Sequence, residues 1–228
     1  MKINEHKIEE EQIGEFASID STIDTANMGL AMTMVSKNLY SNPIGSFIRE
    51  LVSNAVDANV DAKVNKPIMV HIYTEDDCNF IEVRDNGVGM SPDTFKDIYM
   101  SWFNSDKRDT NEKIGGWGLG SKSPFAYQDS FEIITIFDNI KYHYLFVNER
   151  PLPKATLILE EPTDENNGTT IRVEIEKNDT YKVAQECEKQ LAYFDNVYVK
   201  NELYYYNNNF KININLCIIL KGSNFCRP

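Results

Sequence analysis

A glycine-rich run at residues 113–125 is the stretch of this sequence best suited to chemistry. Four of the chain's 11 glycines fall within it. Such a cluster lets another group approach the main chain closely, and successive N–H groups before a helix attract phosphate. Trp117 and Leu119 argue against a flexible surface loop, because a solvated linker favours serine or asparagine. The run matches neither a P-loop nor a dinucleotide fingerprint, so we interpret it as a phosphate loop of a third kind.

Glu50, Asn54 and Asp57 form one polar stripe on a predicted helix. At about 100° per residue they lie at about 0°, 40° and −20°, opposite the apolar residues of the same segment. One interpretation is the solvated face of an amphipathic helix. The other is a nucleotide pocket, in which Glu50 deprotonates an attacking water and Asn54 offers a side-chain oxygen to Mg²⁺.

Two further segments carry residues suited to a purine base. Asp85 follows a strand pattern and precedes Gly87 and Gly89. A buried carboxylate there can accept a hydrogen bond from an exocyclic amine, and the glycines let a base lie flat against the backbone. Thr169 can share the purine edge, directly or through water. Taken singly, each segment also fits an ordinary turn, the first at a strand end and the second in a hairpin.

Helices and strands in an α+β order must position these residues. We expect helices at residues 28–40, 44–62, 91–100 and 182–194, with Pro43 in the first turn of the second helix and Ser91 capping the third. Strand patterns occupy residues 68–74, 80–84, 131–137, 142–147, 156–159 and 170–175. Residues 1–20 fit an edge strand or arm. The order indicates a two-layer sandwich, a mixed sheet covered on one face by helices.

The composition is that of a folded acidic protein. At 228 residues, with 42% hydrophobic residues, the chain can form one sizeable domain, and it has no apolar stretch of about 20 residues to span a bilayer. Its net charge of −12 disfavours direct binding to nucleic acid. The four cysteines and three histidines show no metal-ligand spacing, which favours free thiols in a reducing cytoplasm and excludes a zinc site. Such a protein needs backbone donors and a metal cation to bind a nucleotide.

Together, these pieces resemble the GHKL ATPase superfamily, which includes gyrase B, Hsp90, histidine kinases and MutL. The order is Glu-x-x-x-Asn-x-x-Asp-Ala from Glu50, Asp-x-Gly-x-Gly from Asp85, the glycine run, and Gly-Thr before a strand. Each piece is weak alone, but the order and spacing across residues 44–175 are specific. A closer resemblance, in residues 39–42, 48–51, 114–125 and 127–131, is to the phage rapid-lysis A protein family, the lysis-inhibition proteins of T-even-like phages.

The resemblance implies a Bergerat-type fold with an ATP lid, and a site for ATP and Mg²⁺. Glu50 matches the catalytic, water-activating glutamate, Asn54 the magnesium ligand and Asp57 the third residue of that motif. Asp85 matches the adenine-binding aspartate. The remaining matches are the base-contacting Gly87, Gly89 and Met90, the lid residues Gly115, Gly116, Trp117, Gly118, Leu119, Gly120 and Ser121, the phosphate contacts Lys107 and Lys122, and the adenine-side Thr169.

The same resemblance implies a domain organisation and a mode of action. Residues 1–200 form the ATP-binding domain, and residues 201–228 form a tail or the start of a transducer-like second domain. Because hydrolysing relatives usually take a catalytic lysine from such a second domain, we expect slow hydrolysis. We expect nucleotide to order residues 104–120, the least ordered part of an empty domain, as a lid that switches dimerisation or contact with a host or phage protein. Location in the host cytoplasm follows, with peripheral association at the inner membrane left open.

Two other functions could use the same scaffold. A histidine kinase is disfavoured, because kinases lack the glutamate at position 50 and need a helical dimer segment with an acceptor histidine. A non-catalytic acidic phage protein that uses the same scaffold to bind or inhibit a host factor remains open. The net charge of −12 and the chain's end at Pro228 motivate this alternative.

Overall fold

The computed structural model describes residues 41–100, 120–149, 153–207, 210–213 and 218–219, with side chains up to residue 203. The helical segments are α2 (Pro43–Asp61), α3 (Pro92–Phe95), the π-helical turn η2 (Lys96–Met100), the 3₁₀ helix η4 (Gly120–Ala126), the short η5 (Lys177–Asp179) and α4 (Thr180–Leu191). The expected arm at residues 1–20 and helix at residues 28–40 lie outside the described residues.

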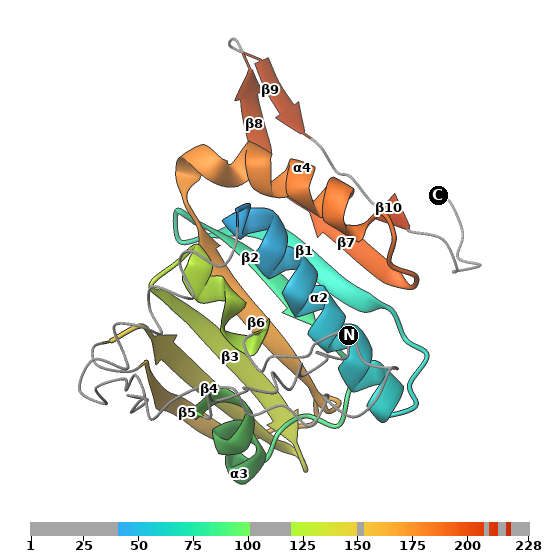
Figure 1. Cartoon of the computed structure of the whole chain (residues 1–228), viewed down its shortest axis with the longest axis vertical. Helices are drawn as coiled ribbons and strands as arrows, with labels where there is room; N and C mark the ends of the chain where they lie inside the picture. The colour runs from blue at the N-terminus through green and yellow to red at the C-terminus, as the bar shows by residue number, and fades with distance from the viewer. Residues whose placement is uncertain (1–40, 101–119, 150–152, 208–209, 214–217, 220–228) are drawn as a thin grey trace, which may run out of the picture.

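The strands form one large sheet and one small hairpin (Figure 1). In chain order they are β1 (Ile68–Glu75), β2 (Cys78–Arg84), β3 (Ser130–Phe137), β4 (Ile140–Val147), β5 (Lys154–Pro162), β6 (Gly168–Ile175), β7 (Val197–Asn201), β8 (Tyr204–Asn207), β9 (Phe210–Asn213) and β10 (Ile218–Ile219). The large sheet has the order β10-β7-β1-β2-β6-β3-β4-β5, and β8 pairs with β9. It is mixed, because β1 and β7 are parallel while the other pairs are antiparallel.

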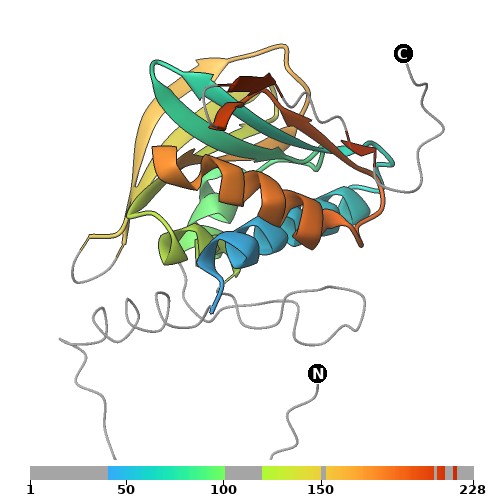
Figure 2. The ribbon, with the colours of Figure 1, turned by 90° about the horizontal axis from the view of Figure 1, so that it is seen from above.

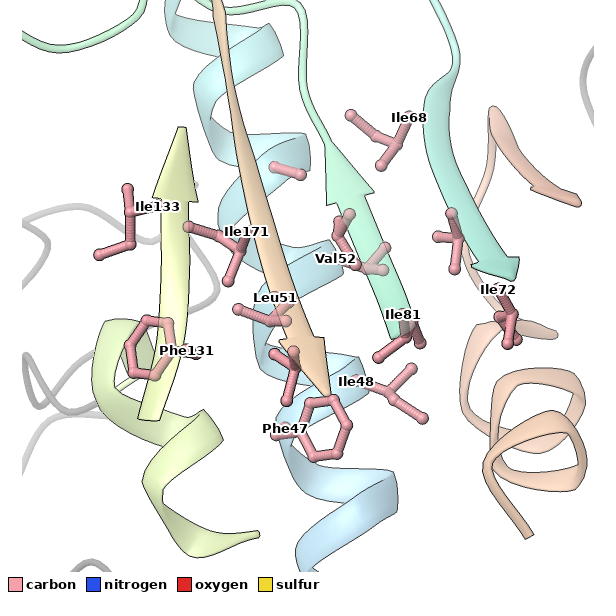
Figure 3. Close-up of a cluster of buried hydrophobic side chains, with 14 of the residues drawn as sticks. Phe47, Ile48, Leu51, Val52, Ile68, Ile72, Ile81, Phe131, Ile133 and Ile171 are labelled. Carbon is pink, nitrogen blue, oxygen red and sulfur yellow. The ribbon is translucent and has the colours of Figure 1, made fainter. Parts of the chain in front are cut away.

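Helices α2 and α4 lie against one face of this sheet (Figure 2), so the predicted two-layer α+β sandwich is confirmed. The core fills the space between the layers. In Figure 3, Leu51 and Val52 of α2 lie near Ile171 and Ile81 of the sheet, and all four are at most 8% exposed. Burial of such side chains stabilises each by about 1.5–3 kcal/mol, which fixes α2 on the sheet.

Helix α2 begins where the sequence predicts. Asn42 is its N-cap, and the Asn42 Oδ1 accepts a hydrogen bond from the Gly45 N–H at 3.1 Å. Pro43 lacks an N–H that the first turn would leave unpaired, so it fits directly after the cap. The Asn42 amide also donates to Glu186 of α4 at 2.8 Å. The cap thus joins the two helices and sets where along the sheet the polar residues of α2 lie.

The turn between β1 and β2 agrees with the sequence pattern, whereas the segment before β6 does not form the hairpin turn that its composition allows. Asp76 and Asp77 both have positive φ, 48° and 63°, so β1 and β2 are joined by a tight two-residue turn. The segment before Thr169 is no hairpin turn, because β5 pairs with β4 while β6 lies between β2 and β3. The alternative of a local hairpin at residues 166–170 is therefore wrong, and this segment is part of a crossover.

The part of the chain beyond residue 200 contributes to the same sheet. β10 pairs with β7, antiparallel, through Ile218 and Ile219. The division into residues 1–200 and 201–228 stays a prediction. No helix within the described residues has the length and apolar character needed to cross a bilayer. Of the four cysteines, Cys78 and Cys187 lie in the described part and are free thiols, as expected.

Candidate functional site

Two strands end and a third begins close together on the helix-covered face of the sheet. Asp85 directly follows β2, Thr169 is the second residue of β6, and Thr135 lies near the end of β3. The register places Thr135 directly opposite Thr169. The Asp85 N–H donates to the Thr169 carbonyl at 2.9 Å, which extends the β2–β6 ladder by one residue. The sheet therefore brings together side chains from three distant parts of the sequence.

The carboxyl group of Asp85 is held by two backbone donors. The residue is 7% exposed, and its Oδ1 accepts from the Gly87 N–H at 2.8 Å and from the Thr169 N–H at 2.9 Å. Burial raises the pKa of Asp85, and the two N–H donors and the Arg84 guanidinium oppose that rise. No residue in the described part of the chain donates to Oδ2. This second oxygen is therefore able to accept a hydrogen bond from a ligand.

The loop that follows Asp85 is pressed against its neighbours. Gly89 has φ +75°, and a Cβ there would lie 1.9 Å from the Ile136 carbonyl oxygen of β3. A Cβ on Gly87 would lie 3.0 Å from that of Ala58 in α2. The Met90 N–H donates to the Thr135 hydroxyl at 2.8 Å. These glycines thus allow close contacts within the protein, and the flat approach of a base against them stays a prediction.

The polar stripe of α2 is only partly solvated. Asp57 is 6% exposed, and the Glu50 side chain is 23% exposed. Asn54 is half-buried, and the Arg49 guanidinium lies 3.8 Å from a Glu50 carboxylate oxygen. A purely solvated helix face does not describe these residues, because Asp57 faces protein.

The end of the glycine run meets this stripe. A Cβ on Gly120, at the start of η4, would lie 2.8 Å from Glu50 Oε2 and 3.6 Å from Asn54 Nδ2. Ser121 follows and is half-buried. The remaining predicted lid residues, Gly115 to Leu119, and the predicted phosphate contact Lys107 lie outside the described residues. The ordering predicted for residues 104–120 is not tested either, because only Gly120 of that segment is described. What the structure places beside Glu50 is therefore the last glycine of the run.

Lys122 is buried beside the same segment. It is 2% exposed, and its Nζ donates to the Ile98 carbonyl oxygen of η2 at 2.6 Å. Burial lowers the pKa of Lys122 to about 8. Lys122 is therefore not a surface lysine. The role of Lys122 as a phosphate contact stays a prediction.

Two residues that support the site were not singled out from the sequence. Asn59 of α2 accepts from the Asn86 N–H at 2.7 Å and donates to the Lys66 carbonyl at 2.9 Å, which holds the loop after Asp85. Thr135 is fully buried between Met90 and Thr169. The sequence carries a signal for both, because each is a polar residue at a position where the pattern is apolar. Asn59 lies about 180° from Glu50 around α2, and Thr135 lies on the inward side of β3.

No group of three or more histidine, cysteine or acidic side chains in the described part of the chain could hold a metal by itself. Asn54 remains the predicted magnesium ligand. A single protein oxygen suits Mg²⁺ only where phosphates and water complete the shell, so the predicted magnesium site would need a bound nucleotide.

Comparisons with known proteins agree with this arrangement. The family model of histidine kinase-, DNA gyrase B- and HSP90-like ATPases matches residues 40–179. The chaperone protein HtpG of Mycobacterium ulcerans is 34% identical over 128 residues, 46% of this chain and 20% of that protein. HtpG of Vesicomyosocius okutanii is 32% identical over 120 residues, covering 43% of this chain and 19% of that one. HtpG of a Sulfurovum species is 24% identical over 174 residues, covering 67% of this chain and 27% of that protein. The chain thus spans about a fifth to a quarter of these relatives.

Proposed function

This chain belongs to the family of histidine kinase-, DNA gyrase B- and HSP90-like ATPases, and we propose that it binds ATP with Mg²⁺ and hydrolyses it slowly. The observation that carries the proposal is the meeting of Asp85 and Thr169 beside α2, with one Asp85 oxygen left without a donor among the described residues. The comparison supports the presence of a GHKL ATPase domain.

The adenine base would bind at the three strand ends. An ionised carboxylate only accepts hydrogen bonds, so Asp85 Oδ2 suits the 6-amino group of adenine. The Thr169 carbonyl accepts the Asp85 N–H, and the Thr169 N–H donates to Asp85 Oδ1. These two hydrogen bonds bring the Thr169 hydroxyl to the same edge of the base. Gly87, Gly89 and Met90 line the loop against which the base would lie. The donor and acceptor chemistry present therefore fits a 6-aminopurine.

The phosphates and Mg²⁺ would lie between the stripe of α2 and the end of the glycine run. Mg²⁺, when bound, neutralises charge on the phosphate oxygens, and Asn54 would hold it through its side-chain oxygen. Glu50 would accept the proton of the attacking water, and Asp57 would support this site from the next turn of the helix. Gly120 fits this arrangement, because a Cβ there would lie 2.8 Å from Glu50 Oε2 and would displace that carboxylate.

We place the physiological role in nucleotide-dependent contact with a partner. Residues 104–120 would close over the phosphates as a lid and switch self-dimerisation or binding to a host or phage protein. The sequence resemblance in residues 114–125 supports a phage protein like the rapid-lysis A proteins, in the host cytoplasm. The proposed switch in dimerisation rests on the resemblance to the GHKL superfamily.

Thermal and urea unfolding with and without Mg·ATP tests the proposal. A ligand that binds only the folded state at 100 times its Kd adds about 2.7 kcal/mol to the free energy of unfolding. We expect a stabilisation of this size with Mg·ATP and a smaller one with Mg·GTP at the same concentration, because guanine presents an oxygen to Asp85. No stabilisation by any nucleotide at saturating concentration would refute ATP binding and favour the non-catalytic interaction protein.

A further inference from the structure

The hydroxyl of Thr135 lies at the centre of the base site, although it is fully buried in β3. Its Oγ1 accepts from the Met90 N–H at 2.8 Å. The same oxygen lies 3.1 Å from the Thr169 Oγ1 and 3.5 Å from the Gly168 carbonyl oxygen. Thr135 therefore connects the loop after Asp85 with the first residues of β6.

The direction of these hydrogen bonds follows from the atoms involved. A backbone N–H can only donate, so Thr135 uses a lone pair for Met90 and keeps one hydrogen to donate. The Thr169 oxygen, at 3.1 Å, is nearer than the Gly168 carbonyl oxygen, at 3.5 Å, and we assign that hydrogen to the Thr169 oxygen. When Thr135 donates to Thr169, Thr169 must direct its own hydrogen elsewhere. Within the described residues, Thr135 is the only hydrogen-bond partner of that hydroxyl.

We propose that Thr135 is a positioning residue that makes the Thr169 hydroxyl a hydrogen-bond donor towards the N1 atom of adenine, directly or through one water. The inference rests on the proposed ATP site and adds the basis of its base selectivity. Asp85 Oδ2 then presents an acceptor beside the Thr169 donor. Adenine carries the complementary pair, a 6-amino donor and the N1 acceptor. A 6-oxopurine carries the reverse pair and is rejected at both atoms.

The experiment compares two ligands and three proteins. Mg·ADP and Mg·1-deaza-ADP differ only at N1, which is a C–H in the second, and neither is consumed by hydrolysis. Wild type, Thr135→Val and Thr135→Ser are titrated by calorimetry, after circular dichroism has verified that each folds. Valine keeps the shape of threonine and removes the hydroxyl, while serine keeps the hydroxyl and serves as the matched control. Should the valine variant not fold, Thr135→Ala replaces it.

We expect wild type and Thr135→Ser to bind Mg·ADP about three- to tenfold more tightly than the 1-deaza ligand, the range of one neutral hydrogen bond. In Thr135→Val this preference should shrink to about twofold or less. Equal weakening of both ligands in Thr135→Val, with the preference intact, would assign Thr135 a structural role and overturn the inference. A wild type that binds both ligands equally would also overturn it, yet leave ATP binding standing. A wild type that binds neither would refute the proposed function itself.

Discussion

Lys122 gives the sharpest prediction, because a lysine buried to 2% exposure must affect stability as the pH changes. Its Nζ donates to the Ile98 carbonyl, and burial lowers its pKa from 10.5 to about 8. Replacing Lys122 by methionine removes the titrating group and keeps a side chain of similar length. The variant also loses the hydrogen bond to Ile98, but that loss does not change with pH.

The sign of the effect follows from the two pKa values. Below pH 8 both folded and unfolded chains carry the proton, and the cost of burying the charge is fully present. Between pH 8 and 10.5 the unfolded chain still binds the proton while the folded chain has released it, so stability rises with pH. Across the whole window the gain corresponds to about 3 kcal/mol in the free energy of unfolding. Wild type should gain this amount relative to Lys122→Met.

Urea unfolding followed by far-UV circular dichroism, repeated at pH steps from about 7.5 to 10.5, measures the difference between the two proteins. Lys96→Met is the matched control, since Lys96 is an exposed lysine of η2 and its loss changes the net charge equally. Curves for wild type and Lys122→Met that stay parallel across the window would refute the reasoning. The reasoning would also be refuted if wild type gained the same stability with pH relative to Lys96→Met.

Three further variants test the site and the loop beside it. Glu50→Ala should lower ATP turnover by about 100-fold or more while Mg·ADP affinity stays the same, as measured by coupled assay and calorimetry, and unchanged turnover would remove Glu50 from the base role. Asp85→Asn should weaken Mg·ADP binding by about tenfold or more, because it puts an amide donor where the 6-amino group needs an acceptor; retained affinity would count against the assignment. Gly89→Ala should lose at least about 2 kcal/mol of stability, because its φ of +75° and the Ile136 carbonyl leave no room for a Cβ. Gly120→Ala is its control, since there the added carbon meets a movable Glu50 side chain, and equal destabilisation by both would contradict the argument.

Local signals in the sequence predict the elements that carry the site. Pro43 and the apolar periodicity place α2 to within a residue of its observed start, and Ser91 caps α3 as expected. Each of these features depends on atoms within four residues along the chain. Backbone capping and side-chain periodicity are local, so they can be found without knowing the fold.

Contacts between distant segments could not be predicted in the same way. The Gly-Thr segment fits a hairpin turn by composition, yet β6 pairs with β2 and β3 and not with β5. Lys122 resembles a solvated lysine in sequence, and its burial depends on the approach of η2. Asn59 and Thr135 are polar residues at positions of apolar periodicity, but the partners that give them a role, Asn86 and Met90, lie on other segments. The sequence patterns therefore do not specify which distant segments pair, and the contacts that depend on this pairing could not be predicted.

That pairing explains why Asp85 and Thr169 form a unit. Asp85 extends the β2–β6 ladder through its N–H, and its carboxylate accepts the N–H of the same Thr169, so the sheet register itself aims the side chain. A slip of one residue would turn Asp85 to the opposite face, away from α2. Gly168, at φ +148°, lets β6 begin this close, because a Cβ there would lie 2.5 Å from the Asp85 carbonyl oxygen. The selectivity of the proposed base site would thus be set by strand register, and variants that disturb the start of β6 should change nucleotide preference before they unfold the domain.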